Sequence, residues 1–255
     1  LGKKDPKWYS TQSPSWKNHF AFPDGENDEF LLERKRNLSK EIFDQEYGAQ
    51  FASFSGKVYP FDRKIDVGKI AFQPNLPTYC TIDFGYRMPA ALFLQTYRQD
   101  GVWHINIIDE IIHEKNIATE TFANKILEKN YPVLYYYGDP AGYNVQGQTG
   151  MGDIEIFRNS GINVRFRTDK ASRNIASSVS YVRGFFESAS GERRIHVSES
   201  CKGIIEDFEN YRYPEEVEGK SLSNDPIKDG YYEHGCDAFR YFITNRFPMV
   251  DNQLI

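Results

Sequence analysis

The chain has 255 residues, of which 40% are hydrophobic and 15% aromatic, so it is long enough for one large core, with or without an appendage. Its net charge of −5 excludes a strongly basic nucleic-acid coat, so a nucleic-acid partner needs a local patch or metal ions that bridge carboxylate and phosphate. The three cysteines form no CxxC pair, which excludes a zinc knuckle or a disulfide framework and favours an intracellular compartment.

The N-terminal part is predicted to be irregular, with two helices. Residues 1–27 are rich in Pro, Ser, Asn, Lys and Trp and show no periodicity, whereas 28–37 has a helical pattern. Ser39 is a suitable N-cap for a second helix, which runs through SKEIFDQEYGAQF. Residues 61–77 predict a loop with one short strand at most, because the segment contains two prolines.

A regular alternation of strands and helices follows. Strands are predicted at 78–85, 90–97, 102–112, 133–138, 162–167 and 194–197, and helices at 117–129, 153–160, 173–189, 199–210 and 234–246. Gln99-Asp100-Gly101 is a hairpin turn signal, and 133–138 has the continuous apolar run of a strand buried on both faces. The order predicts an α/β fold, a mixed central sheet of three antiparallel strands and then parallel strands, flanked by helices. No apolar run reaches the roughly 18 residues that span a bilayer.

Three aspartates stand out because each lies in an apolar context. Asp83 lies in TYCTIDFGYR, where alternation places it on the opposite face from Cys80 and Ile82. Asp139 ends the apolar run VLYYYGDPAG, and Asp237 lies in the predicted helix HGCDAFRYFITNR. A buried carboxylate costs several kcal/mol to desolvate unless something compensates. A divalent cation is the simplest compensator for carboxylates that converge.

The pattern favours phosphodiester hydrolysis. Neighbouring strands lie about 4.8 Å apart, so Asp83 and Asp139 can share a cation if their strands are adjacent, with Asp237 added from the helix. Ligation by oxygen alone favours Mg²⁺ or Mn²⁺ over zinc. Two such ions about 3.5–4 Å apart activate a water and stabilise the leaving oxygen, so no protein nucleophile is required.

Each aspartate also has a structural alternative. Asp139 precedes Pro140, and an aspartate there often starts a turn or caps a helix. Asp83 could be paired with an arginine or lysine inside the sheet, and Asp237 could be an ordinary solvated helix carboxylate. The agreement of all three with one topology favours the metal site.

Segments around these aspartates resemble a known family. TIDFGYRMPAAL, YYGDPAG and HGCDAFRYF are similar to motifs of the nuclease domain of the large terminase subunit of tailed bacteriophages, a member of the ribonuclease H-like superfamily. ENYRYPEE, DPIKDGYYEHGCDAFRYF and GINVRFRTDKASRNIASSVSYVRGFF are also similar, so the resemblance covers about residues 78–246.

The resemblance implies a fold, a site and a role. It implies a ribonuclease H-like fold with Asp83, Asp139 and Asp237 as catalytic metal ligands for Mg²⁺ or Mn²⁺, two ions being expected with DNA bound. It implies an endonuclease that cuts concatemeric viral double-stranded DNA during genome packaging, with little sequence specificity. The implied partners are a portal protein and a small terminase subunit, and the implied location is the host cytoplasm.

The N-terminal part resembles the segment that joins a terminase motor ATPase to its nuclease. SPSWKNHFAF and LSKEIFDQEYGAQFASFSGKVYPF carry this likeness. No GxxxxGK[ST] motif occurs, and Gly219-Lys220-Ser221 lacks the earlier glycine, so an ATPase domain is expected to be absent. The expected division is a linker or remnant at 1–55 and a nuclease domain at 56–255, as a C-terminal piece of a longer packaging motor.

Five basic residues are candidates for DNA contact: Lys170, Arg165, Arg167, Lys228 and His234. Each has an ordinary alternative, as a solvated lysine, an exposed strand arginine or a residue near a helix start. Some members of the superfamily carry a fourth carboxylate. Here Gly235 and Cys236 precede Asp237, and Glu120 matches poorly. Arg240 and Tyr241 are expected to serve packing and ion pairing within the last helix.

Two rival functions remain open. One is a transposase, integrase or resolvase-type nuclease of the same superfamily, which would differ by strand transfer with a 3′-hydroxyl nucleophile. The other is a non-catalytic docking module that binds DNA or a portal ring through its surface and holds no divalent metal at the aspartates.

Overall fold

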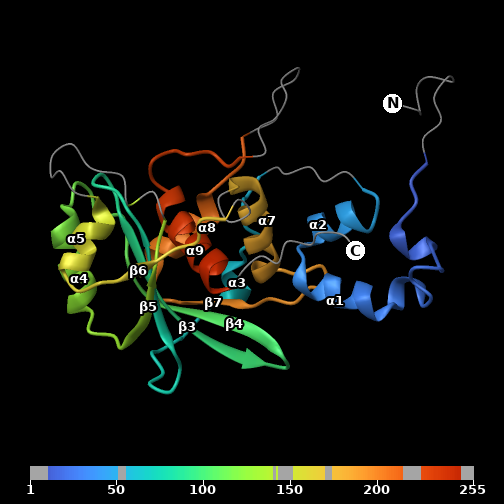
Figure 1. The fold of residues 1–255 in the computed structure, drawn as a ribbon, viewed down its shortest axis with the longest axis horizontal. Coiled ribbons are helices and arrows are strands. Elements are labelled where there is room, and N and C mark those ends of the chain that lie inside the picture. The colour runs from blue at the N-terminus through green and yellow to red at the C-terminus, as the bar shows by residue number, and fades with distance from the viewer. Residues whose placement is uncertain are drawn as a thin grey trace.

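A central sheet separates two layers of helices in the computed structural model, as Figure 1 shows. The structure describes residues 11–50, 56–139, 142, 152–169, 174–214 and 225–247. Within these ranges the strands are β1 (Val67–Gly68), β2 (Thr78–Asp83), β3 (Ala90–Gln99), β4 (Val102–Ile111), β5 (Val133–Tyr137), β6 (Val164–Arg165) and β7 (Ile195–Ser198). Their spatial order is β1-β7-β4-β3-β2-β5-β6.

The sheet is mixed in the predicted way. Strands β2, β3 and β4 pair antiparallel, while β5 pairs parallel with β2, β6 with β5, β7 with β4 and β1 with β7. The β3–β4 hairpin turns at Asp100 and Gly101, both with positive φ (50° and 81°), as a tight hairpin turn requires. The predicted fold class, a mixed sheet flanked by helices, is confirmed.

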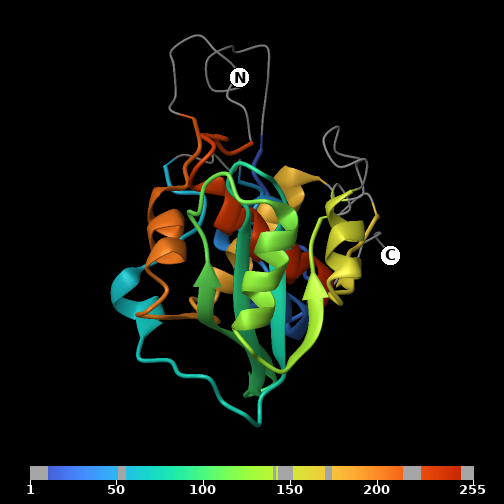
Figure 2. The same ribbon diagram turned by 90° about the vertical axis from the view of Figure 1, so that its left-hand side faces the viewer.

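Two apolar clusters attach the helices to opposite faces of the sheet. The helices are α1 (Glu29–Asn37), α2 (Lys40–Glu46), α3 (Arg63–Asp66), α4 (Thr119–Glu128), α5 (Asp153–Asn159), α7 (Ile175–Phe186), α8 (Lys202–Asn210) and α9 (Glu233–Arg246), with short 3-10 turns at Ser15–Lys17 and Gly25–Asn27. Helices α4 and α5 pack on one face, with Phe122 and Phe157 against Ile82. Helices α7, α8 and α9 pack on the other, with Phe208 and Phe239 in the same cluster as Leu92. In Figure 2 the light-green helix α4 lies in front of the sheet, roughly along the direction of its strands.

The side-chain alternation predicted for β2 is present. Cys80 and Ile82 belong to the cluster under α4 and α5, whereas Tyr79 belongs to the cluster under α9. The buried Thr81 hydroxyl donates to the carbonyl of Ala238 in α9 at 2.6 Å. Asp83 follows on this same face of the strand, two residues beyond Thr81.

Three predictions about the elements were wrong. The run at 133–138 is not buried on both faces, since Leu134 is 53% exposed. The register of β5 against β2 shifts at this point, since Thr78 lies opposite Val133 and Tyr79 opposite Tyr135, which leaves Leu134 as an extra residue. Strand β6 has two residues instead of the six predicted, and the helix α3 was missed because it is only one turn long.

The N-terminal helices dock against α7. Asp28 caps α1 and Ser39 caps α2, as predicted for Ser39. Arg183 of α7 forms an ion pair with Glu41, and Gly184 allows close approach, since a Cβ there would lie 3.1 Å from the Asn37 carbonyl oxygen. The division at residue 55 stays a prediction. No helix in the described ranges combines the length and the apolar character that crossing a membrane requires.

Candidate active site

The pairing of β2 with β5 places two of the three aspartates at one end of the sheet. In this parallel pair Thr81 lies opposite Tyr137. Asp83 is the last residue of β2, and Asp139 lies two residues beyond the end of β5. The carboxyl ends of these adjacent parallel strands therefore place both aspartates at the same end of the sheet, as the sequence pattern requires for a shared site.

Helix α9 brings the third aspartate over this sheet end. The bond from Thr81 to Ala238 fixes the helix over β2 one residue beyond Asp237. Tyr79 of β2 packs against Phe242 one turn further on, with ring centroids 5.6 Å apart. Asp237 is 5% exposed, so it is not a solvated helix carboxylate and that structural alternative is wrong.

Each of the three carboxylates accepts a hydrogen bond from a side chain of α9. His234 Nδ1 lies 2.8 Å from Asp83 Oδ2. Arg240 donates from Nε and Nη2 to Asp237 Oδ1, at 3.1 and 2.9 Å. The Tyr241 hydroxyl donates to Asp139 Oδ2 at 2.8 Å. One face of one helix therefore holds all three aspartates.

The electrostatics of the site favour a cation. Burial raises the pKa of Asp83 to about 6, and the charge of Asp237 adds to the rise, against the opposing effects of His234 and Arg240. The hydrogen bond to Asp83 in turn raises the pKa of His234. Lys228 Nζ lies 3.8 Å from Asp237 Oδ2. Ionising the carboxyl groups therefore costs free energy here, and a positive charge nearby lowers that free-energy cost.

The donor chemistry of the aspartates fits Mg²⁺ or Mn²⁺. In the part of the chain that the structure describes, no three His, Cys, Asp or Glu side chains are already arranged as a metal-binding group. The three aspartates supply oxygen ligands alone, which suits hard divalent cations. Because α9 contacts each carboxylate, a metal ion that gathered them would bind beside this helix.

The basic residues predicted to contact DNA divide into two groups. Lys228 and His234 lie at the aspartates. Arg165 and Arg167 have other partners: the guanidinium of Arg165 lies 3.6 Å from the Tyr135 ring centroid, and Arg167 pairs with Asp169 at 2.7 Å. Lys170 lies outside the described residues.

Glu120 lies on α4, on the opposite face of the sheet from α9, whereas Tyr241 of α9 contacts one of the aspartates. Glu120 is exposed on α4, the helix on the opposite face from α9, so its poor match agrees with its position. Tyr241 was expected, with Arg240, to serve packing and ion pairing within the last helix, and its hydroxyl instead donates a hydrogen bond to Asp139, outside that helix. The sequence signal for that contact is the i, i+4 spacing from Asp237, which places both side chains on one helix face.

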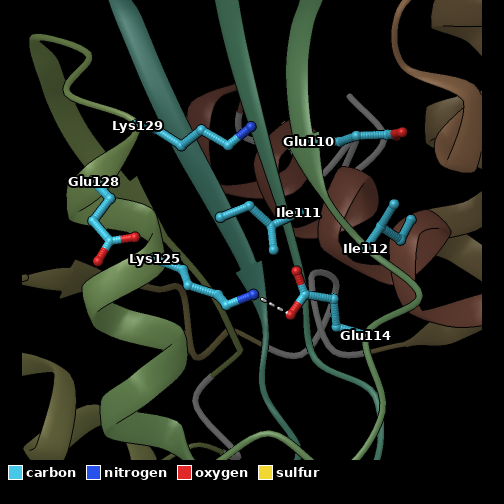
Figure 3. Close-up of a pocket in the computed structure, with 7 residues that line it drawn as sticks. All are labelled: Glu110, Ile111, Ile112, Glu114, Lys125, Glu128 and Lys129. Carbon is cyan, nitrogen blue, oxygen red and sulfur yellow. Dashed lines mark hydrogen bonds and ion pairs between the residues drawn. The ribbon is translucent and has the colours of Figure 1, made fainter.

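A cavity of about 400 Å³ lies elsewhere, between α4 and the end of β4 (Figure 3). Its lining includes Lys125, which pairs with Glu114 at 2.6 Å, and Lys129, which pairs with Asp109 at 2.8 Å. None of the three aspartates lines it. Its lysines are used in ion pairs, so the aspartates, and not this cavity, are the candidate active site.

The sheet order and the two helical layers define a ribonuclease H-like fold. No family model matches the chain. A curated relative, the large terminase subunit of Escherichia phage T5, is 24% identical over 221 residues, which is 84% of this chain and 47% of that protein.

Solved structures of terminases share the fold. The large terminase of a thermophilic bacteriophage aligns with a TM-score of 0.64 and 19% identity over 87% of this chain and 53% of that one. The nuclease domain of the large terminase from bacteriophage SPP1, solved with bound Mn, aligns with a TM-score of 0.51 and 13% identity over 71% of this chain and 96% of the domain. This chain is therefore similar in sequence to the large terminase subunit of phage T5 and has the fold of a terminase nuclease domain, so the predicted resemblance is confirmed. It spans about half the length of the curated relative.

Proposed function

We propose that this chain is a metal-dependent DNA endonuclease that cuts concatemeric viral DNA during genome packaging. The observation that carries the proposal is the gathering of Asp83, Asp139 and Asp237 against one face of α9 at the end of a ribonuclease H-like sheet. The likeness to terminases extends the proposal to a double-stranded DNA substrate and to portal and small-subunit partners. The Mn in the SPP1 structure supports a divalent cation here.

The aspartates would hold Mg²⁺ or Mn²⁺, which when bound supplies an activated water and charge stabilisation at the scissile phosphate. Asp83 and Asp139 provide oxygens from adjacent strands, and Asp237 provides oxygens from above them. Arg240 keeps the carboxylate of Asp237 in one orientation through its two bonds to Oδ1. Binding of a cation also offsets the cost of ionised Asp83, whose pKa burial raises to about 6.

Lys228 and His234 supply positive charge beside the aspartates. The Lys228 side chain is 56% exposed, so its ammonium can reach a DNA phosphate while it remains near Asp237. His234 lies beside Asp83 with 22% of its side chain exposed. Contacts of this kind position a phosphate without reading bases, which agrees with cutting of low sequence specificity.

The replacement Asp83→Asn tests the proposal through plasmid cleavage in Mg²⁺ or Mn²⁺. Loss of one anionic ligand removes several kcal/mol of charge stabilisation, and every 1.4 kcal/mol corresponds to about ten-fold in rate. We therefore expect cleavage to fall by at least about 100-fold. The variant should stay folded, since asparagine has the shape of aspartate and keeps an acceptor for His234.

A matched control is Asp109→Asn. Asp109 is also a half-buried strand aspartate, but it pairs with Lys129 on the α4 side of the sheet. Cleavage by this variant should equal that of the unmodified chain. Full cleavage by Asp83→Asn would contradict the metal-site assignment, whereas joining of DNA ends through a 3′-hydroxyl would favour the transposase-like rival.

A further inference from the structure

Tyr241 of α9 contacts Asp139. Its hydroxyl donates to Asp139 Oδ2 at 2.8 Å, across 102 residues of chain. Asp139 lies two residues beyond the end of β5, so the ladder of the sheet does not fix its side chain. A side-chain contact from a rigid element helps to give such a carboxylate one orientation.

The surroundings of Tyr241 make it a rigid donor. The guanidinium of Arg240 lies 4.6 Å from the centroid of its ring. Arg240 is itself held by two bonds to Asp237 and by the hydroxyl of Ser178 at 3.4 Å. The ring is therefore packed against a side chain that cannot move freely, and its hydroxyl is fixed in direction.

Tyr241 also lies within the field of all three aspartates. Burial raises the pKa of Tyr241 well above its ordinary value, and the charges of Asp83, Asp237 and Asp139 add to the rise. Its hydroxyl donates a hydrogen bond to Asp139 Oδ2 from this position.

We propose that Tyr241 is a positioning residue, which orients the Asp139 carboxylate so that it joins Asp83 and Asp237 in binding a divalent cation. This inference rests on the proposed nuclease function and adds to it a positioning role for Tyr241. Partners that orient metal-binding carboxylates typically contribute about 10- to 100-fold to metal affinity. Tyr241 touches neither the cation nor DNA in this scheme.

The test is Mn²⁺ binding by Tyr241→Phe, followed through the electron paramagnetic resonance signal of free Mn²⁺ in the absence of DNA. Phenylalanine keeps the ring packing and removes only the donor. We expect the affinity for Mn²⁺ to fall by about ten-fold or more. Cleavage by the variant should recover when Mn²⁺ is raised to saturation, because the ligand itself is intact, whereas a merely structural role would leave the Mn²⁺ dependence unchanged.

Tyr131→Phe is a matched control. Tyr131 also donates its hydroxyl to an aspartate, Asp109 Oδ2 at 3.2 Å, but on the α4 side of the sheet. This variant should bind Mn²⁺ with the affinity of the unmodified chain. Equal Mn²⁺ affinity in Tyr241→Phe and Tyr131→Phe would overturn the inference while leaving the nuclease proposal in place.

A second measurement does not depend on any variant. Crystals of the unmodified chain soaked in Mn²⁺ should show anomalous density at the Asp139 oxygen that Tyr241 does not hold, with the tyrosine bond to Oδ2 retained. Mn²⁺ bound to Oδ2 in place of the tyrosine would overturn the inference alone. Absence of Mn²⁺ binding together with absence of cleavage would overturn both proposals.

Discussion

Two buried aspartate–histidine pairs lie near the start of α9, and only one belongs to the candidate active site. His234 lies 2.8 Å from Asp83, and His113 Nε2 lies 2.7 Å from Asp207 Oδ1. Burial raises the pKa of both aspartates to about 6. Taken alone, the two pairs would be equal candidates for a functional site.

Their neighbours separate them. Asp207 is fully buried, and the backbone of Gly235 lies so close to its second oxygen that a Cβ at 235 would overlap with it. The nearby carboxylate of Glu110 is used by the backbone amides of Gly203 and Ile204, at 2.8 Å each. Asp207 is therefore enclosed by the protein, and its Oδ1 is paired with His113.

Asp83, in contrast, keeps 13% of its side chain exposed, and the charge of Asp237 lies near enough to raise its pKa further. Asp139 joins this group through Tyr241. The difference teaches that a raised aspartate pKa in an aspartate–histidine pair does not by itself identify a functional site. Partly exposed carboxylates that converge indicate a functional site, whereas a pair enclosed by the protein indicates a structural role.

The largest effect that we expect is a difference in stability between Asp207→Asn and Asp83→Asn. Removing one partner of a buried ion pair costs about 3 kcal/mol or more, and Asp207 is fully buried beside the partly buried His113, so Asp207→Asn should lower the free energy of unfolding by up to about that amount. Asp83→Asn should lower it less, because Asp83 and His234 are both partly exposed and water can replace part of their interaction. Urea denaturation measures both, and an equal loss in the two variants would contradict the comparison.

A smaller effect should appear in the pH dependence of His113→Gln. Burial alone would lower the pKa of His113, but its hydrogen bond to Asp207 and the charge of Asp207 outweigh burial and raise it. Protonated His113 therefore stabilises the fold fully below its unfolded pKa of about 6.5, and this contribution is lost as pH rises through the raised folded value.

The stability difference between the unmodified chain and His113→Gln should therefore be largest near the lower end of the range from about pH 6.5 to 9. We expect about 1.5 kcal/mol there, as for a hydrogen bond to a charged group, and less at the upper end. Thermal or urea unfolding across this range measures it. A difference that grows with pH would show that the pair is not held by protonated His113.

The smallest effect should come from Glu110→Gln. Glu110 caps α8 through the amides of Gly203 and Ile204, and glutamine has one acceptor oxygen for these two donors. One hydrogen bond is lost, so stability should fall by about 1 kcal/mol or less. DNA cleavage should be unchanged, and a large loss of cleavage would extend the active site to this cluster.

Local pattern predicted some features of the site and not others. Alternation in TYCTIDFGYR placed Asp83 on the face opposite Cys80 and Ile82, as observed, because one face of β2 must enter each core. The exposure of Leu134 was not predictable, because it depends on where the register of β5 against β2 shifts. The contact of Tyr241 with Asp139 likewise depends on where α9 lies over β2, which no local pattern states.

The amino-acid sequence by itself determined the order of strands and helices, the hairpin at Asp100 and Gly101, and which three aspartates lie in apolar surroundings. These features follow from periodicity and turn chemistry, which act between residues close together in the chain. Only the tertiary structure decided that His234, Arg240 and Tyr241 hold the three carboxylates while His113 neutralises Asp207. Such contacts join residues up to 151 positions apart, and they depend on the docking of α8 and α9 against the sheet.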